Sequence, residues 1–182
     1  MKNLLFAVLA AALLLSLTAC SISEILSNMD DVQGKNEVQT IRSSKSNLSL
    51  DFPKNWSAKE TEGATTIQMD YRSDKHMILL EELVSDFSDD VTLNDYILLT
   101  RDTISEGISD VETTEIRDVI ISNNMNAKQF EMISSINEFK FKYLCTCVNA
   151  NGIFYRFVFW CELSMYDDAK PTFDTILNSA TF

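Results

Sequence analysis

The feature that most constrains the fold is an apolar run near the carboxyl end of the chain. Residues 153–161 read IFYRFVFWC, and Arg156 is the single charged side chain among them. Successive side chains of a strand point to opposite faces of a sheet, so a strand of this composition is apolar on both faces. Such strands are usually covered on both sides. We therefore expect this strand to lie inside a sheet with covering elements on each face.

Two segments have the periodicity of helices that could supply this cover. In residues 93–105 apolar side chains recur at helical spacing, Thr92 and Asp95 match an N-terminal capping motif, and Gly107 follows the helix. Residues 168–178 carry Phe173, Ile176 and Leu177, with Pro171 placed in a first turn, where proline is tolerated. Most of the remaining sequence alternates as strands do. We predict an α+β fold, a three-layer α/β/α sandwich with a central antiparallel sheet flanked by helices.

The turn Asn149-Ala150-Asn151-Gly152 predicts a hairpin between residues 138–148 and residues 153–163. We favour a three-residue loop over residues 150–152, with Gly152 in a left-handed conformation. This register places Cys161 opposite Phe141. A two-residue turn at Asn151-Gly152 would instead place Cys161 on the opposite face of the sheet.

Three cysteines follow Cys20 in the chain, at Cys145, Cys147 and Cys161. Cys145 and Cys147 are two residues apart on one strand, and Cys161 lies several residues from either in both registers. These separations exceed what a disulfide tolerates within the hairpin. We expect all three to be buried free thiols.

The first twenty residues have the layout of a bacterial lipoprotein leader. Lys2 precedes an apolar run over residues 4–15, which is too short to span a bilayer, and the run ends in Leu17-Thr18-Ala19-Cys20. This tetrapeptide matches the lipobox, in which a small residue precedes an obligatory cysteine. We predict a signal peptide over residues 1–19, cleavage before Cys20 and attachment of lipid to its thiol, which would anchor the protein to a membrane.

Residues 20–46 are predicted to be the lipidated cysteine and a flexible tether, because they are polar and lack a sustained period. Ile22, Ile25 and Leu26 could alternatively form one amphipathic turn beside the membrane. Alternation begins at Asn47, so we assign residues 47–182 to one globular domain.

The composition excludes several classes of partner. The formal net charge is −12, and loss of Lys2 with the leader would make it −13. An acidic chain offers no electrostatic footprint for nucleic acid or for anionic lipid headgroups. Since 46% of the residues are hydrophobic, the domain can bury a core without metal or disulfide support.

Few residues suggest catalysis or metal binding. His76 is the single histidine, and no nucleophile motif accompanies it. The carboxylates Asp86, Asp89, Asp90 and Asp95 could gather around calcium, but they lack the spacing of an EF-hand loop, and an acidic loop before a helix explains them better.

The neighbouring carboxylates Glu81 and Glu82 should point to opposite faces of a strand and cannot share a substrate. The sequence contains no P-loop, dinucleotide-binding or metalloprotease motif. We therefore predict that the protein is not an enzyme and has no cofactor and no metal site.

Three stretches carry a resemblance to a known family. They are the strand at residues 48–52 running into PKNW at residues 53–56, the long hairpin around residues 149–152, and FDTILNS at residues 173–179. In this order of elements, nearly all of residues 47–182 resembles the PsbP-like superfamily, which includes the extrinsic photosystem protein, the Ran-binding Mog-type proteins and many bacterial lipoproteins. The resemblance implies an α/β/α sandwich used for binding or assembly, with no shared catalytic motif.

The expected function is that of a non-enzymatic, extracytoplasmic lipoprotein. Lipid on Cys20 would anchor the chain to the bacterial cell membrane or outer membrane, and the domain would act as a binding or accessory module for another envelope protein. The alternative is a lipoprotein that binds a small ligand or an ion, in a cleft beside the sheet or at residues 86–90.

Overall fold

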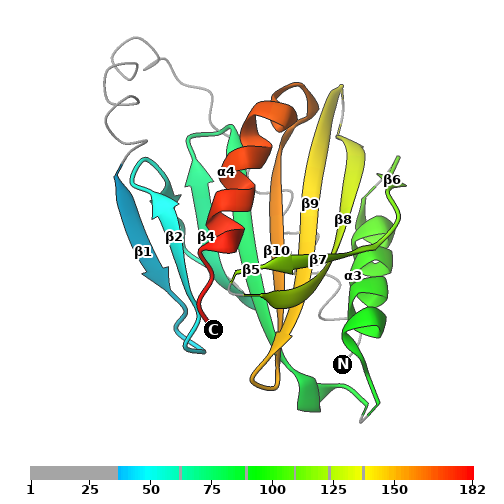
Figure 1. Ribbon diagram of the computed structural model, residues 1–182. Helices are drawn as coiled ribbons and strands as arrows, with labels where there is room; N and C mark the ends of the chain where they lie inside the picture. Colours follow the sequence, from blue (N-terminus) through cyan, green and yellow to red (C-terminus); the bar gives the residue numbers. More distant parts are fainter. Residues whose placement is uncertain (1–36, 62, 89, 109, 123, 137) are drawn as a thin grey trace.

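The computed structural model describes residues 37–182 except for residues 62, 89, 109, 123 and 137. The leader, the lipobox residues Leu17, Thr18, Ala19 and Cys20, and the first part of the predicted tether lie outside the described residues. The domain has an α+β fold in which two α-helices pack against one large antiparallel sheet (Figure 1).

Eight strands form the large sheet, and all its strand pairs are antiparallel. Their order is β3 (Ser57–Ala58), β4 (Thr65–Tyr71), β5 (Lys75–Leu83), β10 (Ile153–Glu162), β9 (Phe139–Ala150), β8 (Met125–Ile136) and β6 (Glu112–Thr113), and β7 (Arg117–Ile121) also pairs with β8. A separate pair consists of β1 (Val38–Arg42) and β2 (Ser49–Pro53). The helices are α3 (Leu93–Gly107) and α4 (Tyr166–Asn178), and the short 3-10 turns η2 (Val84–Asp86) and η3 (Leu163–Met165) follow β5 and β10.

The apolar strand β10 lies between β5 and β9, and residues 154–161 are all buried. Its alternate side chains enter two separate hydrophobic clusters. Phe157 and Phe159 pack in the cluster that contains α4, whereas Val158 and Trp160 belong to the cluster that contains α3. The expectation that this strand is covered on both faces is confirmed.

The predicted start of α3 is confirmed. The Thr92 hydroxyl accepts the backbone N–H of Asp95, and the Asp95 carboxylate accepts the backbone N–H of Thr92, which completes a capping box. Tyr96, Ile97 and Ile104 form the buried side of the helix, as the helical spacing predicted.

Helix α4 begins at Tyr166, two residues earlier than predicted, because η3 leads directly into it. Pro171 consequently lies inside the helix rather than in its first turn. The buried side of the helix, with Phe173, Ile176 and Leu177, is as predicted.

The favoured register of the last hairpin is wrong, and the two-residue alternative is observed. Ala150 pairs with Ile153, and both turn residues have positive φ, 53° at Asn151 and 76° at Gly152. Such a type I′ turn is preferred because its twist matches the twist of the two strands. Cys161 therefore faces Lys142 and lies on the α4 side of the sheet.

Paired strands begin ahead of residue 47, where the sequence predicts the domain to start. β1 pairs with β2 along residues 38–42, and the side-chain amide of Gln39 donates to the carbonyl of Trp56 at 2.6 Å. Ser43 and Ser46 each donate a hydrogen bond of 2.7 Å to the buried Glu81. Since β1 buries no side chain completely, no alternation of polarity marked it in the sequence. Within the described part of the chain, no helix is long and apolar enough to cross a membrane.

Candidate functional site

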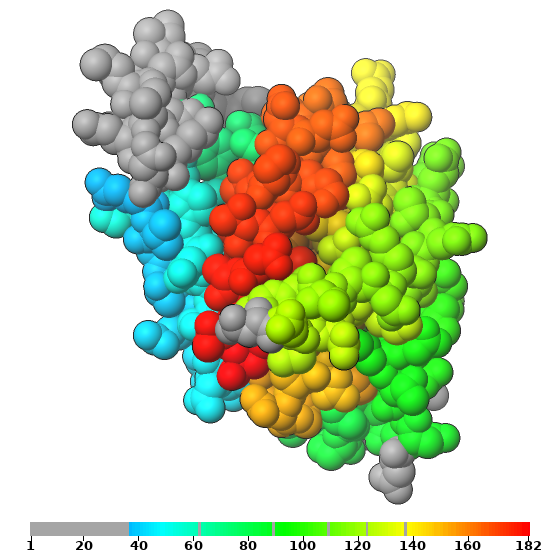
Figure 2. Space-filling view, viewed as in Figure 1, coloured from blue at the N-terminus to red at the C-terminus, as the bar shows by residue number. Residues whose placement is uncertain are grey.

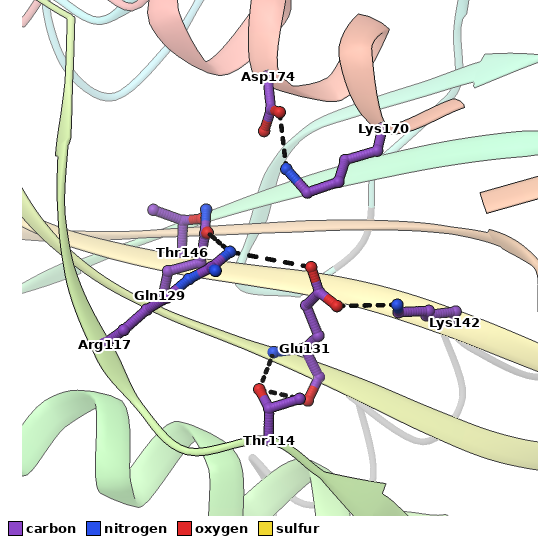
Figure 3. Close-up of polar contacts among 8 residues, drawn as sticks. All are labelled: Thr114, Arg117, Gln129, Glu131, Lys142, Thr146, Lys170 and Asp174. Atoms are coloured by element: carbon purple, nitrogen blue, oxygen red, sulfur yellow. Dashed lines mark hydrogen bonds and ion pairs between the residues drawn. The ribbon is translucent and has the colours of Figure 1, made fainter. Parts of the chain in front are cut away.

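The candidate site is a strip of polar side chains on the α4 side of β8 and β9. Residues that pair directly across an antiparallel ladder share a face, as Gln129 and Thr146 do here. Lys142 is the diagonal neighbour of Glu131, because Glu131 pairs with Leu144. This polar strip comprises Thr114, Arg117, Gln129, Glu131, Lys142, Thr146, Lys170 and Asp174 (Figure 3). It lies between α4 and the β6–β7 segment, which the space-filling view shows in red-orange and yellow-green (Figure 2).

Glu131 is the centre of the polar strip. Lys142 Nζ lies 2.8 Å from one carboxylate oxygen of Glu131, and Arg117 Nη2 lies 3.8 Å from the other. Thr114 fixes the backbone of Glu131, since its hydroxyl accepts the Glu131 N–H at 2.9 Å and its own N–H donates to the Glu131 carbonyl at 2.9 Å. The side chain of Glu131 is 17% exposed, so it is held at the base of the strip but still reaches solvent.

The buried end of the polar strip is a chain of hydrogen bonds. Arg117 Nη2 donates to Gln129 Oε1 at 2.8 Å, and Gln129 Nε2 donates to the Thr146 hydroxyl at 2.9 Å. Gln129 and Thr146 are buried, so these bonds satisfy groups that water does not reach. They also hold the Arg117 side chain over the sheet.

Helix α4 lies along one side of the polar strip. Lys142 Nζ lies 4.1 Å from the centre of the Tyr166 ring, a distance typical of a cation–π contact. Burial of the Tyr166 hydroxyl raises its pKa, and the negative charge of Glu131 raises it further. At the rim, Lys170 and Asp174 form an ion pair of 2.7 Å along the helix.

The charge of the polar strip suits recognition of an acidic group. Among the eight residues drawn in Figure 3, Arg117, Lys142 and Lys170 are cationic, while Glu131 and Asp174 are anionic. Each carboxylate already has a lysine within 2.8 Å. Arg117 makes the longest of these ion pairs, 3.8 Å to Glu131, and its side chain is 55% exposed. The guanidinium of Arg117 is therefore placed to receive a carboxylate from outside.

A first prediction concerns the pH dependence of Glu131. Burial raises its pKa, but the hydrogen bond and charge of Lys142, together with Tyr166 and Arg117, outweigh burial and leave the pKa below 4.5. A lowered folded-state pKa stabilises the protein above the unfolded-state pKa, and this contribution is lost as pH falls through the folded-state value. Glu131→Gln should therefore cost about 1 kcal/mol at neutral pH. The difference from wild type should shrink below pH 4.5 in urea unfolding.

Asp174→Asn is the matched control, because its carboxylate is 41% exposed at the rim of the same polar strip. It should cost less than Glu131→Gln at neutral pH. A cost of Glu131→Gln that stays constant from neutral pH to pH 3 would contradict the role assigned to the ionised carboxylate.

The single histidine of the sequence is held in a structural arrangement. His76 Nδ1 lies 2.9 Å from Asp70 Oδ1, and His76 Nε2 lies 3.2 Å from the carbonyl of Ser73. The ring stacks on Trp160 with 4.9 Å between centres. Both ring nitrogens are thus engaged within the domain. Asp70 becomes the partner of His76 because the two residues pair across β4 and β5, and this pairing could not be read from local sequence patterns.

The described carboxylates of the predicted acidic loop have separate roles. Asp95 is engaged in the capping box of α3, Asp86 closes the 3-10 turn η2, and Asp89 lies outside the described residues. Among the described residues, no group of three or more His, Cys, Asp or Glu side chains could hold a metal ion.

The prediction that Glu81 and Glu82 face opposite ways is confirmed. Glu81 accepts from Ser43 and Ser46, whereas Glu82 on the other face meets Arg156 at 2.6 Å.

Cys145, Cys147 and Cys161 are buried and unpaired, as predicted. Cys145 and Cys147 lie on the α3 side, and Cys161 lies on the α4 side. Burial raises all three thiol pKa values, to about 12 for Cys147 and about 11 for Cys161. Thiols with such pKa values are poor nucleophiles at neutral pH.

A second prediction follows for the thiols. Reductant or chelator should leave the melting temperature unchanged, whereas loss of a native disulfide typically costs ~2–5 kcal/mol. Thiol counting on the denatured, unreduced protein should find the three free thiols Cys145, Cys147 and Cys161. A lower count would show that at least one of them pairs, within the chain or with another molecule.

The fold and the site define an antiparallel α+β domain with a polar, solvent-reaching strip beside its C-terminal helix. No protein-family model and no curated protein matches the sequence.

Solved structures do share the fold. Cyanobacterial PsbP (CyanoP) from Synechocystis matches with a TM-score of 0.63 and 15% identity, over 91% of this chain and 98% of that chain. LpqN, which is involved in cell envelope biogenesis of Mycobacterium tuberculosis, matches with a TM-score of 0.60 and 9% identity, over 85% of this chain and 95% of that chain. The Ran-binding protein Mog1p from Saccharomyces cerevisiae matches with a TM-score of 0.54 and 7% identity, over 80% of this chain and 95% of that chain. The resemblance to the PsbP-like superfamily is thus confirmed at the level of the fold.

Proposed function

We propose that this chain is an extracytoplasmic lipoprotein, anchored by lipid on Cys20 to the cell membrane or outer membrane of a bacterium. Its domain acts as a non-enzymatic binding or accessory module for another envelope protein. In this proposal the domain is a three-layer α/β/α sandwich, with α3 and α4 on opposite faces of the sheet.

The observation that carries the proposal is the sequence Leu17-Thr18-Ala19-Cys20 at the end of the apolar leader. A thiol is the side chain that can take a diacylglyceryl thioether, and a leader of this length with a small residue before the cysteine has the layout of export and cleavage. The fold supports the proposal, since LpqN, a protein of the same fold, is involved in cell envelope biogenesis.

The surface we assign to the partner is the outer side of β7 and the polar strip behind it. Ile120 on β7 is 66% exposed, among the most exposed large apolar side chains of the described domain. Arg117 lies three residues earlier on the same strand, is 55% exposed, and makes only a long ion pair of 3.8 Å with Glu131. Arg117 and Ile120 point to opposite faces of β7, so a partner that meets both would offer an apolar side chain to the outer face and a carboxylate to the polar strip.

The proposal can be tested with a photo-crosslinking amino acid in cells that produce the native lipoprotein. Placed at Ile120, it should give one adduct of defined mass, and Arg117→Gln should weaken that adduct. Placed at Leu99, which is 50% exposed on α3, it should give none. Equal labelling from both positions, or no protein adduct at Ile120, would contradict this assignment. Native mass spectrometry that finds a co-purified small molecule would favour the alternative of ligand binding.

A further inference from the structure

Two strands of the domain begin with an exposed apolar side chain. Among the described residues, five large apolar side chains are at least half exposed, and Phe139 is the aromatic one. Phe139 begins β9, is 58% exposed, and pairs with Ile136 where the β8–β9 hairpin closes. Val38 begins β1 and is also 58% exposed. Exposed apolar residues scattered singly are ordinary, so what matters is where these two lie.

The β8–β9 hairpin projects from one end of the large sheet. Lys75 follows the β4–β5 turn and pairs with Cys161 near the end of β10. The last residue of β10, Glu162, pairs with Phe141 on β9. Phe139 therefore lies two residues beyond the end of β10, about 7 Å further along the strand direction.

The described part of the chain begins at this same end. Val38 pairs with Pro53 at the end of β2. The chain then continues to Ser57, which pairs with Asp70 next to the last residue of β4. Figure 1 shows the start of β1, the β4–β5 turn and the β8–β9 hairpin at the upper end of the domain. The chain that leads back to Cys20 is therefore joined to the end from which the hairpin projects.

The composition of the hairpin favours apolar insertion into lipid over attraction by charge. Phe139 lies between Glu138 and Lys140, whose opposite charges offset one another, and the whole chain has a formal net charge of −12. An aromatic ring can lie among lipid headgroups, while a neighbouring lysine extends its ammonium to water along an apolar stem. The hairpin therefore suits a bilayer surface that is not strongly anionic.

We propose that this end of the domain faces the bilayer and that the β8–β9 hairpin inserts Phe139 among the headgroups of the membrane that holds Cys20. Val38 lies 18 residues after Cys20, so about 60 Å of extended chain is the longest separation the anchor allows. One aromatic side chain binds lipid weakly, but the anchor raises its effective concentration at the surface. The inference rests on lipid at Cys20, which belongs to the proposed function.

This orientation leaves the proposed partner surface accessible. β7 pairs with residues 125–129, at the start of β8, whereas the hairpin closes at Ile136. Ile120 on β7 therefore lies away from the end that faces the membrane.

Quenching by labelled lipid tests the proposal in the full-length lipidated protein, reconstituted into phosphatidylcholine nanodiscs. A fluorophore is attached through Ser73→Cys, at an exposed position of the β4–β5 turn, or through Leu83→Cys. Leu83 is 52% exposed at the opposite end, where it pairs with Ile153. The native thiols of the described domain are buried and should remain unlabelled. Lipids that carry a nitroxide near the headgroup should quench the fluorophore at position 73 several-fold more than the one at position 83, and equal quenching would overturn the proposal.

A matched pair of variants tests Phe139 itself, with the fluorophore at position 73. Phe139→Ser should reduce the quenching several-fold, whereas Phe139→Trp should retain it because an aromatic ring remains. Leu99→Ser removes an apolar side chain that is 50% exposed on α3 and should leave the quenching unchanged. Unchanged quenching in Phe139→Ser, or an equal fall in Phe139→Ser and Leu99→Ser, would exclude insertion of Phe139.

Mass spectrometry of the same sample reports whether Cys20 carries lipid. If it carries none, the lipoprotein assignment fails and this inference fails with it. Lipid on Cys20 together with equal quenching at positions 73 and 83 would refute the orientation and leave the lipoprotein assignment standing.

Discussion

Replacing Arg156 by Met is expected to destabilise the domain by about 3–5 kcal/mol, measured by urea unfolding. Arg156 is the single charged residue in residues 153–161 of the central strand and is 6% exposed. Its Nη2 lies 2.6 Å from Glu82 Oε2, and the Tyr96 hydroxyl donates to the same carboxylate oxygen. The side chain of Glu82 is 14% exposed. Loss of the guanidinium would leave this carboxylate buried with only a tyrosine as partner.

A double variant distinguishes the loss of the Arg156–Glu82 ion pair from the cost of leaving one charge buried without a partner. Glu82→Gln/Arg156→Met removes both charges, and it should recover part of the lost stability because no ion is then left buried. Lys54→Met is the surface control, since Lys54 and Glu37 form an ion pair whose side chains are 55% and 58% exposed. Its effect should be much smaller. A loss for Arg156→Met no larger than that of Lys54→Met would show that the buried cluster does not depend on its cation.

Replacing Cys20 by Ala is expected to abolish lipidation completely. Alanine has no thiol to take the diacylglyceryl group, so the precursor should accumulate unprocessed, and the wild-type N-terminus should be a lipidated Cys20 by mass spectrometry. A single acyl chain binds membranes only marginally, and stable anchoring takes two signals. The wild-type protein should therefore fractionate with membranes and carry more than one acyl chain.

Ser21→Ala is the control, because it lies next to Cys20 and outside the lipobox tetrapeptide. It should be processed and lipidated like the wild type. An unmodified wild-type N-terminus at any position other than Cys20 would refute the anchor, and with it the main part of the proposed function.

Much of the fold could be predicted because local patterns reported burial directly. The run at residues 153–161 placed β10 inside the sheet, since each of its faces needed apolar cover. The capping box at Thr92 and Asp95 marked the start of α3, because those two side chains satisfy backbone groups of the same turn. The opposite directions of Glu81 and Glu82 followed from strand geometry alone.

The site was harder to predict because its partners are distant in sequence. Lys142, Glu131 and Arg117 come from three strands, and only the pairing of β7, β8 and β9 brings them together. Each appears as an ordinary surface charge in an alternating strand. Asp70 beside His76 and Glu82 beside Arg156 were missed for the same reason, although a lone arginine in an apolar strand signals that a buried partner is required.

The sequence alone determined the two helices, the central strand and the sides of these elements that are buried, because those properties depend on residues a few positions apart. The tertiary structure decided the register of the last hairpin and the inclusion of β1. In the hairpin, the strand twist favours the two-residue turn at Asn151 and Gly152, and this choice puts Cys161 on the α4 side. β1 is held mainly by backbone pairing and polar contacts, which leave no period in the sequence.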